Sequence, residues 1–183
     1  MGDPHRKDRY GETWPQHRVD AYLRDLTTLR DLVVVSGGWA WHLMSPAGHV
    51  ELKHAHDHKD VDLFVEGRNV AALYERLAGL GYVRVPTRYD KRLRTPYEFH
   101  RYERVAEPDG HEPFRVTIDL FVGEPPVREL EGGWRVVCPR HLVTLYKTVH
   151  GSDKCFAVQA AIRLLIMGVD PVGRPELCEP PAG

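Results

Sequence analysis

Two periodicities alternate along the chain. In some segments apolar residues recur every three or four positions, as on one face of a helix, and in others they form short runs or occupy every second position, as in a strand. The first pattern predicts helices over 18–32, 39–44, 69–81, 139–150 and 153–167. The second predicts strands over 32–36, 61–65, 82–85, 114–122 and 132–138. This order favours an α/β (α+β) fold, a mixed twisted sheet flanked by helices with a short C-terminal helical part.

The length of 183 residues suits one substantial hydrophobic core. We expect four parts: a flexible N-terminal segment over 1–17, a main domain over 18–138, C-terminal helices packed on it over 139–169, and an irregular tail over 170–183. The 25 Lys and Arg nearly balance the 26 Asp and Glu, for a net charge of -1. Bulk charge therefore does not mark a dedicated nucleic-acid binder.

The cysteines and the lengths of the apolar runs indicate in which cellular compartment the protein is expected. Cys138, Cys155 and Cys178 are odd in number and lack CxxC spacing, which disfavours a disulfide scaffold and a zinc knuckle. The first residues are polar, unlike a secretory signal, and no apolar run reaches the roughly 18 residues of a membrane span. We therefore expect a cytoplasmic protein that does not enter a membrane.

The segment HAHDHKDVDLFVEG, at 54–67, contains two aspartates one residue apart at the start of a strand. Side chains alternate between the faces of a strand, so Asp60 and Asp62 share one face while Val61, Leu63 and Val65 point into the core. Two adjacent carboxylates repel each other unless a cation lies between them, and oxygen ligands suit Mg²⁺ or Mn²⁺. The alternative is a pair of edge-strand charges that face water.

A third carboxylate, Asp119, lies in the strand FRVTIDLFV at 114–122. It is on the polar face of that strand, between Thr117 and Phe121. If this strand pairs beside 61–65, Asp60, Asp62 and Asp119 converge. They could then bind two metal ions and activate a hydroxyl for attack on a phosphate.

Ser36, Gly37 and Gly38 lie between a predicted strand and a predicted helix. Glycine lets the backbone approach a phosphate closely, and the amide groups at a helix N-terminus favour its negative charge. These residues are therefore candidates for nucleotide binding. A tight turn with no ligand is the alternative.

The order of these motifs resembles the DNA polymerase beta type nucleotidyltransferase superfamily. The segments GGWA at 37–40, HKDVDL at 58–63 and VTIDLFV at 116–122 match most closely its minimal branch, the aminoglycoside and lincosamide nucleotidyltransferases. The segment VCPRHLVTLYKTVHGSDK, at 137–154, resembles a later helix of that branch that carries a Tyr-Lys pair. The resemblance covers about residues 33–165. It implies a nucleotidyltransferase-type sheet within 18–138.

The resemblance also implies roles for individual residues. Gly37 and Gly38 would hold the triphosphate, and Asp60 and Asp62 would bind the metal ions. Asp119 would be the third metal ligand or the general base on the acceptor hydroxyl. Two further cofactor-binding residues are implied: Lys147, which would contact the phosphates, and His58, which would orient a carboxylate or touch a phosphate.

The implied reaction moves a nucleoside monophosphate from an NTP, with ATP expected, to a hydroxyl of an antibiotic-like small molecule and releases pyrophosphate. One alternative is a toxin-like nucleotidyltransferase that acts on transfer RNA or protein. Another is a non-catalytic nucleotide-binding module. The oligomeric state stays open.

Two other clusters have competing interpretations. His49, His54 and His56 could bind a second metal such as zinc or nickel, or could be solvent-facing hydrogen bonders. The segment 88–104 interleaves aromatic residues with six basic ones, which is typical of an RNA or nucleotide contact, or it forms a solvated hairpin. The basic residues are Arg88, Lys91, Arg92, Arg94, Arg101 and Arg104. Trp39 and Trp41 are expected to pack in the core.

Overall fold

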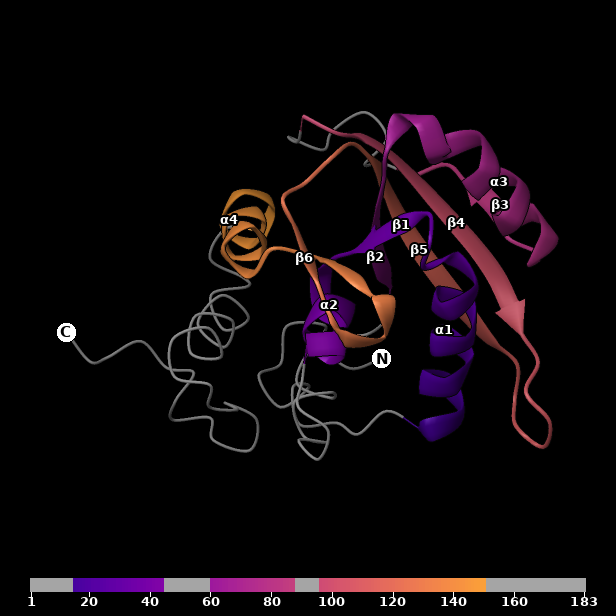
Figure 1. The fold of residues 1–183 in the computed structure, drawn as a ribbon. Coiled ribbons are helices and arrows are strands. Elements are labelled where there is room, and N and C mark those ends of the chain that lie inside the picture. The colour runs from indigo at the N-terminus through magenta and orange to yellow at the C-terminus, as the bar shows by residue number, and fades with distance from the viewer. Residues whose placement is uncertain (1–14, 45–59, 88–95, 151–183) are drawn as a thin grey trace.

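The computed structural model describes residues 15–44, 60–87 and 96–150, with side chains as far as 145. The helices are α1 (Gln16–Leu29), α2 (Gly37–Met44), α3 (Val70–Gly79) and α4 (Pro139–His150), with 3-10 turns at η3 (Gly67–Asn69) and η4 (Glu131–Gly133). The strands are β1 (Val33–Val35), β2 (Val61–Val65), β3 (Val83–Val85), β4 (Glu98–Ala106), β5 (Phe114–Val122), β6 (Val127–Glu129) and β7 (Arg135–Val137). Figure 1 shows their arrangement.

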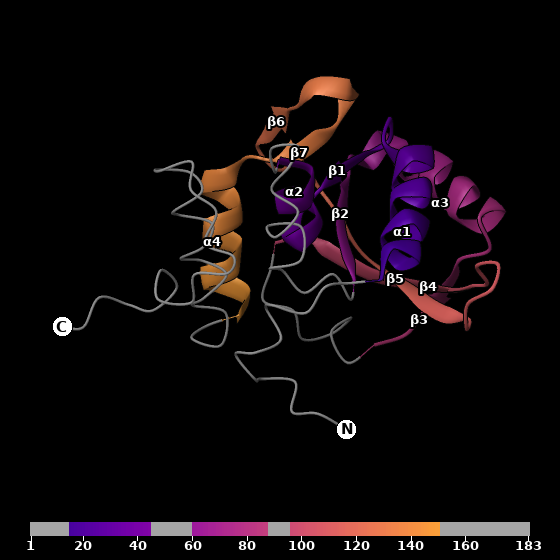
Figure 2. The same cartoon turned by 90° about the horizontal axis from the view of Figure 1, so that it is seen from below.

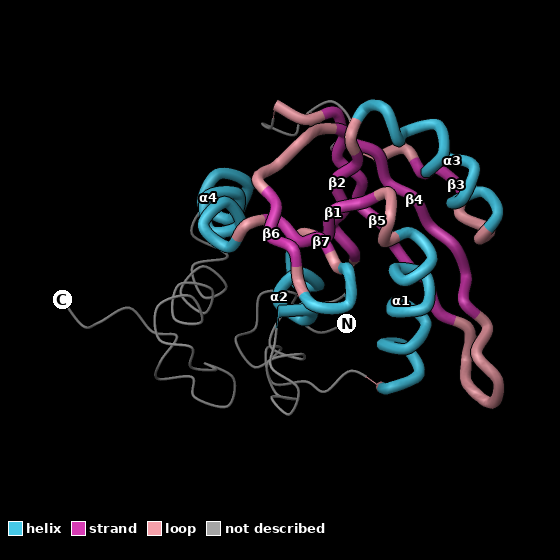
Figure 3. The backbone as a smooth tube through the Cα atoms, in the orientation of Figure 1, coloured by secondary structure: helices cyan, strands magenta, loops and turns pink. Residues whose placement is uncertain are grey.

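Within the described ranges, seven strands form one sheet in the order β3-β4-β5-β2-β1-β7-β6 (Figure 3). The pairs β2–β5 and β1–β7 are parallel, and the other neighbours are antiparallel. The sheet is therefore mixed, as predicted. Because β2 has β1 and β5 on its two sides, and β5 has β2 and β4, both strands lie in the interior of the sheet.

One face of the β3–β4–β5–β2 part of the sheet packs on α1 and α3, which lie on the same side of it (Figure 2). Leu63 and Leu120 point to that side and are 0% exposed. From the helices, Leu26 of α1 and Leu73 of α3 join the same core. Period-2 alternation in the strands and helical spacing in α1 and α3 thus supply the two surfaces of the core.

A buried polar network also attaches α1 to the sheet. The carboxylate Oδ2 of Asp25 accepts hydrogen bonds from the hydroxyl of Tyr82, at 2.6 Å, and from Nε of Arg104 in β4, at 2.7 Å. Asp25 is only 4% exposed, and burial together with this carboxylate raises the pKa of Tyr82. Three segments that are distant in sequence therefore meet at one carboxylate.

The predicted helices and strands in the described ranges are confirmed, with shifts of a few residues at their ends. Two differences stand out. The sequence pattern missed the strand β6, and the alternating part of 88–104 is not a solvated hairpin but the nine-residue strand β4, which lies inside the sheet. The predicted helix over 153–167 and the tail lie outside the described residues. No helix in the described part has the length and apolar character of a membrane span.

Candidate functional site

Asp62 of β2 and Asp119 of β5 are paired in register in two adjacent parallel strands. Paired residues of neighbouring strands point to the same face, with backbones about 4.8 Å apart. This is the face opposite α1 and α3. Asp119 is 8% exposed, and both strands are interior, so these two are not edge-strand charges. The two aspartate strands therefore pair, which is the condition under which the sequence places these carboxylates together.

Asp60 directly precedes β2 and has the parity of Asp62, and its side chain is 39% exposed. Asp60 and Asp62 are both half-buried, whereas Asp119 is buried. We call the surface formed by Asp60, Asp62, Asp119 and their neighbour Arg101 the carboxylate face. Its acids come from two strands that only tertiary pairing brings together.

The turn at Ser36 and Gly37 packs directly on Asp62. The backbone N–H of Ser36 donates to the carbonyl oxygen of Asp62 at 2.8 Å. Gly37 has φ of 58°, and a Cβ placed on it would lie 1.9 Å from Oδ2 of Asp62. The glycine is therefore required twice, by its left-handed backbone and by the carboxylate beside it. The turn before α2 and the carboxylates thus form one site.

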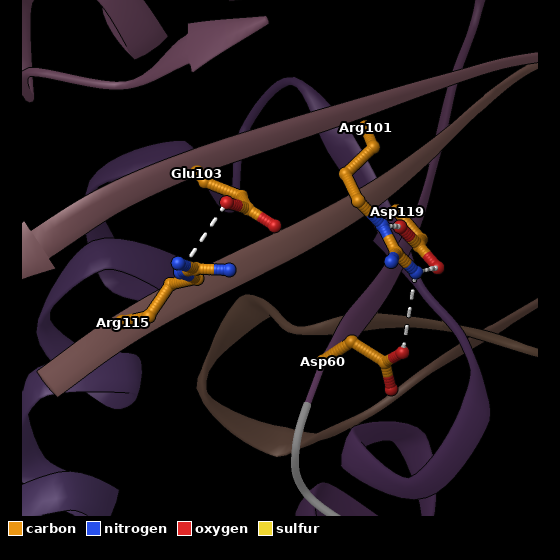
Figure 4. Close-up of polar contacts among 5 residues, drawn as sticks. All are labelled: Asp60, Arg101, Glu103, Arg115 and Asp119. Atoms are coloured by element: carbon orange, nitrogen blue, oxygen red, sulfur yellow. Dashed lines mark hydrogen bonds and ion pairs between the residues drawn. The ribbon is translucent and has the colours of Figure 1, made fainter. Parts of the chain in front are cut away.

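Arg101 was not predicted as a site residue, yet its guanidinium contacts both Asp119 and Asp60 (Figure 4). It is paired in register with Asp119 across β4 and β5. Its Nε and Nη2 donate to the two oxygens of Asp119 at 2.6 Å each, and Nη2 lies 3.7 Å from Oδ2 of Asp60. The hydrogen bonds to Asp119 raise the pKa of Arg101, and the charge of Asp60 adds to this. Such a bidentate, charge-assisted pair is stronger than a single neutral hydrogen bond.

The same face continues along β4 and β5 with a second ion pair. Glu103 lies two residues beyond Arg101, and Arg115 of β5 approaches it at 3.4 Å between Nε and Oε2 (Figure 4). Arg115 is 70% exposed, in contrast to Arg101 at 23%. The two arginines share one face, but only Arg101 is held among the candidate ligands.

The donor chemistry of the carboxylate face suits Mg²⁺ or Mn²⁺, because all of its acids offer oxygen. Its geometry is only partly that of a metal site. In the described residues, no three His, Cys, Asp or Glu side chains come together as ligands of one ion. Arg101 already uses both oxygens of Asp119, although a carboxylate has about four acceptor positions and keeps others. A metal ion that binds Asp119 would therefore lie close to the positively charged guanidinium of Arg101.

Several predicted site residues stay untested. His58 and the cluster His49, His54 and His56 lie outside the described residues. Lys147 lies in α4, but its side chain is beyond the described part. Gly38 follows Gly37 in α2 and is half-buried.

The basic aromatic segment 88–104 falls only partly within the described residues. Arg88, Lys91, Arg92 and Arg94 lie outside the described residues. Arg101 and Arg104 each bind a carboxylate, of Asp119 and Asp25, so part of their hydrogen-bonding capacity is already used within the fold.

Trp39 and Trp41 are 0% and 1% exposed, which confirms that they pack in the core.

Sequence reasoning missed Arg101 for an identifiable reason. The sequence favoured only an RNA or nucleotide contact or a solvated hairpin for 88–104, and in β4 residue Arg101 lies on the same face as Glu103 and Val105. Only the β4–β5 register, which pairs residues 18 positions apart, puts Arg101 opposite Asp119. Comparison with known proteins adds no family: no protein-family model matches the chain, and a search of curated proteins gives no match.

Proposed function

We propose that the protein is a metal-dependent nucleotidyltransferase that moves a nucleoside monophosphate from an NTP, with ATP expected, to a hydroxyl of an antibiotic-like small molecule. The observation that carries this proposal is the register pair of Asp62 and Asp119, with the Gly37 turn packed against Asp62. Carboxylates from two strands and a glycine turn before a helix are what phosphoryl-group transfer needs. The nucleotidyltransferase-type fold is part of the same proposal.

Each residue of the site would have a separate role in this reaction. Asp60 and Asp62 would hold Mg²⁺ or Mn²⁺, which supplies positive charge to the triphosphate. The backbone at Gly37 and Gly38, at the start of α2, would bind phosphate oxygens. The acceptor oxygen forms a bond to the α-phosphorus as the bond to pyrophosphate breaks. Asp119, buried on the same face, would take the hydroxyl proton or serve as a third ligand.

A second candidate is supported by one observation. The bidentate bond from Arg101 engages both oxygens of Asp119, the group proposed as base or ligand. A non-catalytic nucleotide-binding module would keep such a pair permanently. An enzyme would have to open or share it during turnover.

Label transfer separates the two candidates. The protein is incubated with Mg²⁺ and each α-labelled NTP, together with aminoglycosides, lincosamides, total RNA and cell protein. Asp119→Asn serves as the inactive variant. Asp109→Asn, in the exposed β4–β5 turn, is the matched control that should remain active.

Label in a small molecule with wild type and Asp109→Asn, but not with Asp119→Asn, supports the proposal. Label in RNA or protein would instead identify a toxin-like acceptor class. Absence of label with every acceptor, while the nucleotide still binds, would reject transfer to these acceptors and favour the binding module.

A further inference from the structure

We propose that Arg101 is a built-in counter-cation that competes with a divalent metal ion for Asp119 and Asp60, and so sets the metal affinity of the site. The inference rests on the proposed function in one respect: it takes these carboxylates as metal ligands. It concerns the metal-binding step alone, and it can be tested without nucleotide or acceptor.

The side chain of Arg101 contacts two of the candidate metal ligands. The guanidinium of Arg101 makes two 2.6 Å contacts to Asp119, which lies in β5, and approaches Asp60, which directly precedes β2, at 3.7 Å. One cation therefore contacts acids from two different segments of the chain. Its planar fork matches a carboxylate, and the pair is largely shielded, with Arg101 at 23% and Asp119 at 11% side-chain exposure. An ion that draws on the same oxygens must displace Arg101 or share them with it.

Charge gives Arg101 a second role on this face. When ionised, Asp60, Asp62 and Asp119 each carry one negative charge, and Arg101 offsets one of these charges. Like charges on one face repel each other, and a cation among them reduces that repulsion. Arg101 therefore stabilises the face before any ion arrives, and its removal leaves more negative charge to attract an ion.

Arg115 differs from Arg101 in its partner and its exposure. It lies on the same face and pairs with Glu103, but at 3.4 Å and with its side chain 70% exposed. Solvent screens such a pair, and Glu103 is not a candidate ligand. Arg115→Gln is therefore a matched control, since it removes the same type of charge from the same face without touching Asp119.

The test is Mn²⁺ binding to the nucleotide-free full chain, measured by the paramagnetic resonance signal of unbound Mn²⁺, for wild type, Arg101→Gln and Arg115→Gln. Loss of a partly buried competing ion pair is expected to tighten Mn²⁺ binding about tenfold, or to add one bound ion per chain, in Arg101→Gln. Arg115→Gln should stay within about twofold of wild type.

A second variant, Arg101→Lys, keeps the inference testable if Arg101→Gln does not fold. Lysine keeps the charge but cannot bind both oxygens of Asp119, so its Mn²⁺ affinity should lie between those of wild type and Arg101→Gln. If both Arg101 variants are folded and bind Mn²⁺ no more tightly than wild type, the inference is overturned. If only the lysine variant folds, an unchanged affinity in that variant overturns it.

The outcome is independent of transfer activity. A purely structural Arg101 would lower stability without tightening Mn²⁺ binding, so the binding measurement separates the two roles. Tighter Mn²⁺ binding in a protein that transfers no label would support the inference and reject the proposed reaction. Label transfer by the wild type, together with unchanged Mn²⁺ affinity in the Arg101 variants, would support the proposed reaction and reject the inference about Arg101.

Discussion

Gly37 lies so close to Asp62 that a Cβ on the glycine would be 1.9 Å from the Oδ2 of the aspartate. The contact joins the turn after β1 to the first residues of β2. It makes the glycine a structural requirement of the carboxylate face, whatever ligand that face binds.

Replacing Gly37 by alanine should therefore destabilise the protein. The added methyl group meets Asp62, and φ of 58° is unfavourable for alanine, so we expect a loss of about 1–3 kcal/mol in the free energy of unfolding. Urea titration measures it. Gly79→Ala, at an exposed position of α3 with nothing within 4 Å of its Cβ, should be neutral or slightly stabilising.

A double-mutant cycle then assigns the cause. Asp62→Ala removes the carboxylate that the new methyl group would meet, so Gly37→Ala should cost less in that background by about 1 kcal/mol. Equal costs in both backgrounds would show that backbone strain alone is responsible and that the contact with Asp62 is not.

The network around Asp25 should be a major source of stability. Asp25→Ala leaves the guanidinium of Arg104, with its side chain 15% exposed, without its carboxylate, and leaves the buried Tyr82 hydroxyl without its acceptor. We expect a loss of about 3–5 kcal/mol. Tyr82→Phe removes one hydrogen bond and should lose about 1 kcal/mol.

Chemical denaturation of these variants beside Asp20→Ala provides the comparison. Asp20 is on the same helix but exposed, and its side chain accepts from Gln16 at the surface. A loss for Asp25→Ala no larger than that for Asp20→Ala would contradict the assigned role of the network.

The pair of Glu66 and Arg135 should make stability depend on pH. The hydrogen bond from Arg135, at 2.7 Å, lowers the pKa of Glu66 below its ordinary value, and Arg68 acts in the same direction. A carboxyl group whose pKa is lower in the folded state stabilises the protein above its unfolded pKa, and this contribution is lost as the pH falls through the folded value.

Urea titrations of wild type and Glu66→Gln between about pH 7 and pH 3 check the sign. The variant should be less stable at neutral pH, and the difference should shrink below about pH 4.5. Glu124→Gln, in an exposed loop, is the control and should follow wild type throughout. A difference that grows as the pH falls would contradict the assignment.

Local patterns were sufficient for much of this fold. In 61–65 and 114–122 the aliphatic residues Val, Ile and Leu recur at every second position, so the sequence alone placed Asp60, Asp62 and Asp119 on the faces opposite their core residues. The strand β6, with three exposed residues, has no such pattern and was missed. Alternation of apolar and polar residues predicts which face of a strand points to the core only where one face is buried and the other is not.

The sequence by itself determined most of the described helices and strands and the parity of each aspartate, because the twofold repeat of a strand is a property of the local backbone. Only the tertiary structure decided which strands are neighbours and in what register. That register brings Asp62 beside Asp119, Arg101 onto both oxygens of Asp119, and Gly37 against Asp62. These contacts depend on how distant segments share one buried core, and no local periodicity encodes that choice.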